Sequence, residues 1–564
     1  MLNLRRALVA VLLLTLVVFA WLWFTRPRRV EMAGYAPADS IVYVEAESLP
    51  EVFDAFTATD AWRELAPAAG VEARPSWTGW LPSFVSFTGL GPSDTVVLSR
   101  AQVAVTVLGF QAAEESDTTL KLSPRAALVA ETHTSEWRVR AAVEKLVGDF
   151  ARRSLGAPPV ERKEVDGVPF YLWAEQAGAR RKIVAAVAGS LAVVGNDEAT
   201  VRACLDVRRG ARPSLAGDAG LREMRARLGG EGALAFGYAP RGSVAKTVEV
   251  FAPAFVGGVS EEPQMQSVLA TLAPRVFNQT LGSIGWRARV VGGAVEDAYF
   301  VSLAGGMAER LQEPLATAQH TYGAAAALPA DVYQVSLYDF RSPEEAYRGT
   351  GAALSSQVDA ASALFITRGL KEFLKPYGVE NPREFLRACG TQLATARLAP
   401  SSEGKVLVAS VRDRAALREQ ALAYLGRGAR AERAGDVELL VSDDPELGAA
   451  AFAGEHLLMG PEEDVRRCVA AMGEGRTLRD GALLKAAPPE FSESAAFART
   501  FTDDRDAARN VLTHFARRGG DAGALEAALA RRGYSVSETR LAEGGFEKRT
   551  RSAFGLFGEI YTRL

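Results

Sequence analysis

The chain has 564 residues, of which 48% are hydrophobic and 24% are charged, and its formal net charge is −3. This composition is typical of a globular protein with more than one domain and not of a disordered chain. Because the chain is mildly acidic and its basic clusters are short, it lacks the positive surface that nucleic acid requires, and we expect no nucleic-acid partner.

An uncharged and almost wholly apolar run covers residues 7–24. As an α-helix this run would be about 27 Å long, which suffices to cross the hydrocarbon core of a bilayer. A cleaved signal peptide is the alternative, but the run ends in Trp21, Trp23 and Phe24 without a small-residue cleavage site. Residues 1–30 are therefore predicted to hold an uncleaved membrane anchor.

Charge does not decide the orientation of this anchor, because arginines flank the run on both sides: Arg5 and Arg6 precede it, and Arg26, Arg28 and Arg29 follow it. Arginine greatly outnumbers lysine, which suggests a GC-rich bacterial genome. Since bacterial proteins with one N-terminal span usually export the domain that follows, we expect a single-pass inner-membrane protein with a large extracytoplasmic body.

Short motifs recur in the same order in the two halves of the chain. The tripeptide Pro-Ala-Asp occurs at residues 37–39 and 329–331, and the segment Val-Arg-x-Cys occurs at 201–204 and 465–468. Such recurrence indicates a duplication, with too few copies for a solenoid. We predict a first repeat domain (residues 36–315), an Ala-rich linker (residues 316–327) and a second repeat domain (residues 328–564).

In chain order, the first repeat is predicted to begin with a strand over residues 40–46 and a helix that starts after Ser48. Ser48 and Glu51 have the spacing of a capping box, and so do Ser342 and Glu345 in the second repeat. In this motif the serine hydroxyl accepts a backbone N–H of the first helical turn. The motif indicates structure and not a functional site.

Strands are then predicted over residues 102–108 and 126–131, with counterparts at 392–398 and 405–411. An amphipathic helix follows from about Glu136, because its apolar residues recur at helical spacing.

A strand meander over residues 160–194 leads into the helix that carries Cys204, and residues 233–238 form a further strand. The repeat closes with a hairpin that turns at Gly292-Gly293, and we place the equivalent turn of the second repeat at Gly544-Gly545. Together these elements predict an α+β fold: two tandem copies of a mostly antiparallel sheet with helices packed on one face, preceded by a single transmembrane helix.

The three cysteines are Cys204, Cys389 and Cys468. Cys204 and Cys468 lie on the apolar stripes of equivalent helices, so we interpret them as small buried hydrophobic residues. A disulfide between them would require the two copies to face each other closely. No Cys-x-x-Cys motif is present, so a zinc or thioredoxin-like site is not expected.

Ser243 and Lys246 have the Ser-x-x-Lys spacing of penicillin-binding proteins, but the two companion motifs of those enzymes are absent. The second repeat has Asp503-Asp504 at this point, and serine and aspartate share the ability to cap a helix. We therefore interpret Ser243 as a cap.

The four histidines, His133, His320, His456 and His514, are isolated in the sequence. A dispersed Ser-His-Asp triad remains an alternative, because its members need not be adjacent. The acidic run at residues 503–506 could bind a hard cation, although its arginine and the following helix favour capping. We predict no catalytic residue, no metal site and no cofactor.

Trp77 and Trp80 lie in an insertion that the second repeat lacks. They could rest on the bilayer or line a groove, although a place in the core is the favoured interpretation.

The chain resembles a family of bacterial membrane-anchored proteins known only as a domain of unknown function. The resemblance lies in the N-terminal span, the opening residues 35–39 before a strand, the strands from leucine to glycine at 191–195 and 457–460, and the doubled layout. It implies an extracytoplasmic domain and provides no activity and no site residues.

Three functions are compatible with the sequence. The first is a non-enzymatic binding or scaffold protein of the cell envelope with a protein partner. The second is a carrier of a lipid or other apolar ligand, and the third is a hydrolase with a dispersed serine site. A binding or scaffold function is the favoured prediction.

Overall fold

The computed structural model of the chain describes residues 29–71, 97–98, 100–116, 119–156, 158–175, 181–230, 232–256, 263–317, 322–402, 404–426, 428–479, 481, 491, 495–515 and 520–556. Within these segments no helix is both long enough and apolar enough to cross a membrane. The predicted anchor at residues 7–24 and the predicted insertion with Trp77 and Trp80 lie outside the described residues.

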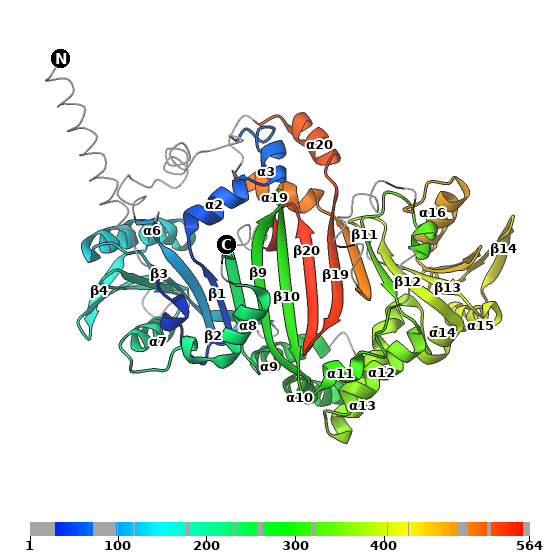
Figure 1. Cartoon of the computed structure of the whole chain (residues 1–564), viewed down its shortest axis with the longest axis horizontal. Helices are drawn as coiled ribbons and strands as arrows, with labels where there is room; N and C mark the ends of the chain where they lie inside the picture. The colour runs from blue at the N-terminus through cyan, green and yellow to red at the C-terminus, as the bar shows by residue number, and fades with distance from the viewer. Residues whose placement is uncertain are drawn as a thin grey trace, which may run out of the picture.

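The described strands form one antiparallel sheet that runs the length of the molecule (Figure 1). In the first half of the chain, the strands lie in the order β4-β5-β6-β7-β3-β2-β1-β8-β9-β10. Their bounds are β1 (Val42–Ala46), β2 (Gln102–Ser116), β3 (Thr119–Glu131), β4 (Val160–Val165), β5 (Val168–Ala174), β6 (Lys182–Ala188), β7 (Leu191–Gly195), β8 (Ala235–Ala239), β9 (Leu281–Val291) and β10 (Ala294–Leu303).

The second half of the chain repeats this order as β14-β15-β16-β17-β13-β12-β11-β18-β19-β20. The bounds are β11 (Gln334–Asp339), β12 (Cys389–Arg397), β13 (Val406–Val411), β14 (Arg430–Ala434), β15 (Val437–Val441), β16 (Ala449–Ala453), β17 (His456–Gly460), β18 (Ala498–Asp503), β19 (Tyr534–Ala542) and β20 (Gly545–Ser552).

The two halves meet where β10 pairs with β20, from Val295 opposite Ser552 to Ser302 opposite Gly545. The strand order therefore reads the same from either edge of the sheet to its middle, and an approximate two-fold axis passes between these two strands (Figure 1). A Cβ atom on Gly545 would lie 2.1 Å from the carbonyl oxygen of Val301. Glycine is thus what lets β20 approach β10 at this point.

The main helices alternate with the strands along the chain. Their bounds are α2 (Leu49–Thr57), α3 (Asp60–Leu65), α6 (Glu136–Leu155), α7 (Glu198–Arg208), α8 (Ala219–Leu228), α9 (Ser243–Val256), α10 (Pro263–Thr280), α11 (Met307–Leu311), α12 (Pro343–Ser355), α13 (Ala360–Leu374), α14 (Pro382–Ala388), α15 (Arg414–Leu425), α16 (Glu462–Gly473), α19 (Arg505–Phe515) and α20 (Ala522–Ala530). The short 3₁₀ helices are η1 (Met32–Tyr35), η2 (Leu215–Gly217), η3 (Gly323–Ala327) and η4 (Lys375–Tyr377).

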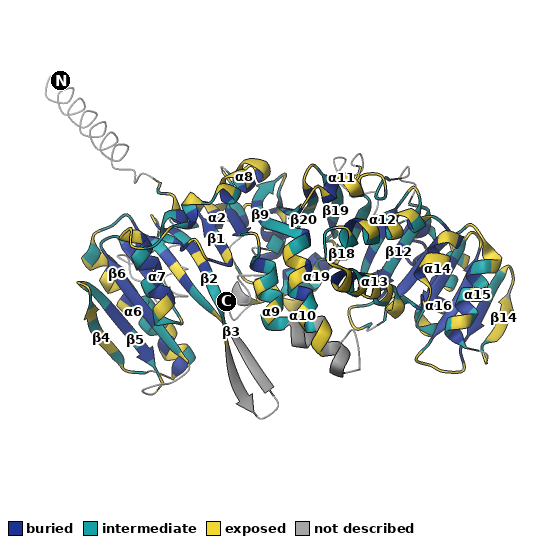
Figure 2. Ribbon diagram, turned by 90° about the horizontal axis from the view of Figure 1, so that it is seen from below, coloured by how far each residue is buried: buried dark blue, intermediate teal, exposed yellow. Residues whose placement is uncertain are grey.

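Helices cover both faces of the outer strands, so the prediction of helices on one face is wrong. In the first half, α6 packs on one face of β6 through Ala185 and Val187, and α7 packs on the other face through Val184 and Ala186. The second half repeats this arrangement with α15 and α16. The physical reason is that β6 is apolar at successive positions, which is the pattern of a strand buried on both sides. Figure 2 shows this burial along the strands, with the exposed residues on the outward sides of the helices.

Helices from opposite halves pack together at both ends of the central strands (Figure 1). At one end, Phe56 and Trp62 of the α2–α3 segment share a buried cluster with Val511 of α19 and Leu529 of α20. At the other end, α10 packs on α13, and an ion pair joins the two through Arg275. Each half therefore stabilises the other through its helices as well as through the strand pair.

The structure confirms the capping serines and places the second hairpin turn differently. The hydroxyls of Ser48 and Ser342 accept the backbone N–H groups of Glu51 and Glu345. The first hairpin turns at Gly292-Gly293, as predicted. In the second hairpin, however, Gly545 already pairs with Ala542, so the turn is Glu543-Gly544 and not Gly544-Gly545. Gly544 alone has the positive φ, 76°, that this turn requires.

The Ala-rich segment expected to be a linker ends inside the second half. Its residues 323–327 form η3, and Ala324, Ala325 and Ala327 are buried in the same core as Cys468. This segment precedes β11 as η1 precedes β1.

Candidate functional site

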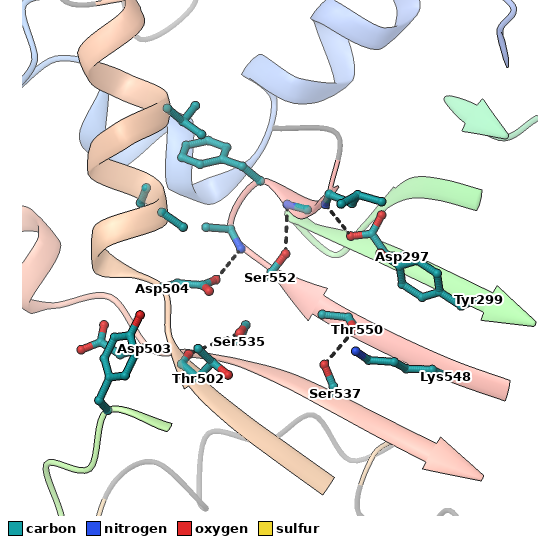
Figure 3. A pocket seen from close by; sticks show the side chains of 18 residues that line it. Asp297, Tyr299, Thr502, Asp503, Asp504, Ser535, Ser537, Lys548, Thr550 and Ser552 are labelled. Carbon is teal, nitrogen blue, oxygen red and sulfur yellow. Dashed lines mark hydrogen bonds between the residues drawn. The ribbon is translucent and has the colours of Figure 1, made fainter. Parts of the chain in front are cut away.

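A cavity of about 310 Å³ lies between α19 and the strands at the middle of the sheet (Figure 3). The strands β18, β19, β20 and β10 form its floor, and Ala507, Ala508 and Val511 of α19 form an apolar side. The backbone that follows β20, residues 553–556, forms another wall. We call this cavity the central pocket.

Hydroxyl side chains line the floor of the central pocket, because alternate residues of β19 and β20 point to the face that carries α19. Ser537 lies opposite Thr550, and their hydroxyl oxygens are 2.7 Å apart. Ser535 lies one step further along β19, and its hydroxyl donates to the carbonyl oxygen of Thr502. Ser552 accepts the backbone N–H of Gly555.

Asp297 closes the floor from β10 and is buried. Its carboxylate accepts the indole N–H of Trp286 at 2.9 Å and the backbone N–H of Leu556 at 2.9 Å. These two bonds hold the segment after β20 against a strand of the first half. Asp297 is therefore a positioning residue for the pocket wall.

Asp504 lies at the start of α19 and is half-buried beside the pocket. Its carboxylate accepts the backbone N–H of Ala553 at 3.0 Å. Burial raises the pKa of this carboxyl to about 6, although the bonds from Ala553 and Ser535 and the charge of Arg532 work in the opposite direction. In the part of the chain that the structure describes, no cation lies within ion-pair distance of Asp504.

Lys548 stands at the mouth of the pocket and is exposed. Figure 3 shows its amine directed toward Thr550 and Ser537. Its nitrogen is 5.9 Å from the ring centre of Tyr299, and no described carboxylate lies within ion-pair distance of it. Opposite charges without ion-pair partners thus occupy two sides of one cavity.

The predicted alternative of a cation site at residues 503–506 fails on geometry. Asp503 forms an ion pair with Arg505, Asp506 forms one with Arg509, and Asp504 forms none with a described residue. No group of three potential metal ligands occurs among the described residues. The acidic run is divided because the backbone passes from a strand to a helix within it.

Except for Asp297 and Tyr299 of β10, the polar residues that line the central pocket belong to the second half of the chain. The hairpin registers pair Arg289 with Glu296 and Arg540 with Glu547, which makes the two hairpins equivalent residue by residue. By that equivalence the positions of four pocket residues carry large apolar or aromatic side chains in the first half. Ser535, Ser537, Thr550 and Ser552 correspond to Ile284, Trp286, Tyr299 and Val301.

Of the sequence candidates for catalysis, the described residues Ser243, His133 and His456 do not line this pocket. Ser243 is buried and is the first residue of α9. The cap position of this helix belongs to the preceding residue, Gly242, so the interpretation of Ser243 as a cap is wrong by one position. The Nε2 atom of His133 lies 2.9 Å from the Oε1 atom of Gln102, and the Gln102 side chain also forms hydrogen bonds with the backbone of Val30. His456 begins β17, and burial lowers its pKa. His320 lies outside the described residues, as does the side chain of His514.

All three cysteines are buried and free. Cys204 and Cys468 belong to separate cores, so the arrangement that a disulfide between them requires is absent. Burial raises the pKa of each thiol to about 12. The prediction of small buried hydrophobic residues is confirmed for Cys204 and Cys468.

Sequence reasoning missed the residues of the central pocket. One signal was present: serine, threonine and lysine alternate with other residues at 535–539 and 548–552, where the first half has isoleucine, tryptophan and tyrosine.

A search of protein-family models, of curated proteins and of solved structures finds nothing that matches the chain.

Proposed function

We propose that the chain is a non-enzymatic binding protein of the bacterial cell envelope, with the central pocket as its ligand site. In this proposal residues 7–24 anchor the chain in the inner membrane and the body lies outside the cytoplasm. The two halves of the body are tandem copies that arose by duplication. The observation that carries the proposal is the polar pocket lining of one half where the other half is apolar.

The repeated strand order and the paired salt bridges support the duplication. Arg289 binds Glu296 in the first hairpin, and Arg540 binds Glu547 at the equivalent place in the second. Features that both halves retain serve the shared fold. A polar cavity in one half serves something else, because polar groups replace apolar packing there at a cost in stability.

The contacts of the pocket hydroxyls favour binding over covalent catalysis. A serine nucleophile needs a base within hydrogen-bond reach. Here Ser537 contacts a threonine hydroxyl and Ser552 a backbone amide. Ser535 contacts the carbonyl oxygen of Thr502 and the carboxyl of Asp504, and no histidine is among the described residues that line the pocket. The polar floor also favours a polar ligand over the acyl chain that a lipid carrier would hold.

The placement is tested by a C-terminal alkaline phosphatase fusion, which is active only outside the cytoplasm. We expect activity from the full chain and none from a matched fusion that lacks residues 7–24. An inactive full-length fusion that is expressed and folded would contradict the extracytoplasmic body.

The ligand site is tested by native mass spectrometry of the full chain purified in detergent from cells. We expect a bound small molecule that is lost when Ser537→Ala and Thr550→Val are combined. The matched control combines Ser336→Ala and Thr500→Val, whose hydroxyls lie 2.9 Å apart in the same cross-strand row but outside the pocket. Retention of the adduct by the first pair, or its loss from both, would refute the pocket as the site.

A further inference from the structure

The central pocket has opposite charges on its two sides, and this arrangement specifies the chemistry of a ligand. Asp504 lies on the α19 side and Lys548 at the mouth (Figure 3). Asp504 directly follows β18 and Lys548 lies on β20, and along β19 their positions are five residues apart, because Asp503 pairs with Tyr534 and Lys548 with Thr539. Their backbones are therefore roughly 20 Å apart, and the lysine side chain, which is directed toward Ser537, brings the two charges closer. They do not neutralise each other, because neither has an ion-pair partner in the described part of the chain.

We infer that the pocket binds a small zwitterion, with its ammonium group beside Asp504 and its anionic group beside Lys548. The inference rests on the proposed function, since it names the class of ligand for that same site. The ammonium group would donate a charge-assisted hydrogen bond to the Asp504 carboxylate, and Ser535 and Thr502 add oxygen acceptors nearby. A carboxylate or phosphate at the other end would accept from Lys548 and from the hydroxyls of Ser537 and Thr550.

The walls between the two charges fit an apolar connecting chain. Ala507, Ala508 and Val511 present methyl groups on one side, and the rings of Tyr299 and Tyr333 also line the pocket. The volume of about 310 Å³ corresponds to about ten water molecules at the liquid value of ~30 Å³ each. A molecule the size of a dipeptide or of an ω-amino acid with a short methylene chain suits this space.

The negative groups inside the pocket exclude a simple anion, and Lys548 disfavours a diamine. Three carboxylates line the pocket: Asp503 is neutralised by Arg505, Asp297 accepts N–H groups of the protein itself, and Asp504 has no ion-pair partner among the described residues. A ligand with a negative charge at both ends would place the second charge beside the Asp504 carboxylate, which would repel it. A diamine would place its second charge beside Lys548, so only a ligand with one charge of each sign satisfies both sides.

Four probes with the same six-carbon chain test the inference: 6-aminohexanoate, hexanoate, hexylamine and 1,6-hexanediol. Each is titrated calorimetrically at pH 7.5 into the full chain in detergent. We expect 6-aminohexanoate to bind at least tenfold more tightly than any of the other three. Equal affinity for hexanoate, hexylamine or hexanediol, or no binding of 6-aminohexanoate at 10 mM, would overturn the zwitterion.

Two variants then assign the ends of the ligand. Lys548→Met is expected to reduce the affinity for 6-aminohexanoate to that for hexylamine, and Asp504→Asn to reduce it to that for hexanoate. Lys371→Met, at an exposed position of α13, is the matched control and should leave the affinity unchanged. An equal loss in this control, or no loss in the first two, would also overturn the assignment.

The test of the ligand class can fail independently of the test of the binding function. If no probe binds but the full chain still carries a pocket-dependent small molecule from cells, the ligand class is wrong and the binding function stands. If the adduct is absent as well, both are wrong.

Discussion

Asp297 and Leu556 are 259 residues apart in the chain, and the carboxylate of the first accepts the backbone N–H of the second at 2.9 Å. Asp297 belongs to β10 in the first half, and Leu556 follows β20 in the second. The side chain of Leu556 packs on Trp286 and Ala288 of β9. The end of the second half is therefore fastened across the central strand pair onto the first half.

Replacement of Asp297 by alanine is expected to destabilise this connection. Two buried donors, the indole N–H of Trp286 and the N–H of Leu556, would lose their acceptor, at a cost of about 3 kcal/mol in the free energy of unfolding. Urea unfolding of the full chain in detergent, followed by circular dichroism, measures the effect. Asp436→Ala, in an exposed turn, should change stability by less than about 0.5 kcal/mol. If the two substitutions lower the stability equally, the hydrogen bonds of Asp297 do not fasten the two halves together.

Asp504 is expected to make the stability of the fold depend on pH. Its folded-state pKa of about 6 exceeds the ordinary value of 3.8 for an aspartate, so the folded protein binds the proton more tightly than the unfolded chain does. The contribution of the protonated group is fully present below pH 4 and is lost as the pH rises through 6. Asp504→Asn should therefore be more stable than the natural chain by about 3 kcal/mol at pH 8 and nearly equal to it at pH 4.

Melting temperatures of both proteins from pH 4 to pH 8 test this expectation. A difference that stays constant over the range would show that burial does not shift the pKa of Asp504.

Gly545→Ala is expected to disturb the junction of the two halves. The new methyl group would lie 2.1 Å from the carbonyl oxygen of Val301, a backbone atom that cannot move without displacing β10. We expect a loss of about 2 kcal/mol, as for an overpacked core. Gly473→Ala, at an open position near the end of α16, is the matched control and should be neutral or slightly stabilising. A neutral Gly545→Ala would show that the central pair tolerates a wider spacing.

Trp62 is expected to stabilise the contact between the helices of opposite halves. It is buried, its ring lies 5.6 Å from that of Phe56, and Phe56 stacks on Phe554 of the second half at 4.9 Å. Trp62→Ala should cost about 4 kcal/mol, the usual range for a buried aromatic residue. Trp137 is 66% exposed on α6, so Trp137→Ala is the control and should cost less than about 0.5 kcal/mol. Comparable losses would contradict the helix contact.

The cysteines are expected to resist thiol reagents in the folded protein. Burial raises the pKa of all three thiols to about 12, so the reactive thiolate is scarce and shielded at pH 8. Titration with an aromatic disulfide should detect no thiol in the native chain and all three in urea. Ser135→Cys, at an exposed position before α6, provides a positive control that should react at once. Rapid native labelling of Cys204 or Cys468 would contradict the burial.

Local features of the fold were predictable because they depend on neighbouring residues. The capping serines, the amphipathic helix after Glu136 and the buried stripes with Cys204 and Cys468 follow from spacing alone. The second hairpin turn was misplaced by one residue, because Gly544 and Gly545 are equivalent in the sequence. The strand register separates them: Gly544 makes the turn, and Gly545 makes room for Val301.

The layer arrangement was only partly predictable. Successive apolar residues in β6 and β16 indicate burial on both faces, but such short runs are also compatible with a helix or with one covered face. The structure resolves this ambiguity, because α6 and α7 in one half and α15 and α16 in the other lie on opposite faces.

The α+β class, the repeated order of motifs, the capping serines Ser48 and Ser342 and the burial of Cys204 and Cys468 follow from the sequence, because each depends on periodicity or on residues a few positions apart. Tertiary structure alone decided that β10 and β20 pair into one continuous sheet and that Asp297, Asp504 and Lys548 surround one pocket. These residues come from three distant segments. Their proximity follows from strand pairing and helix packing across the whole chain, and no local pattern encodes it.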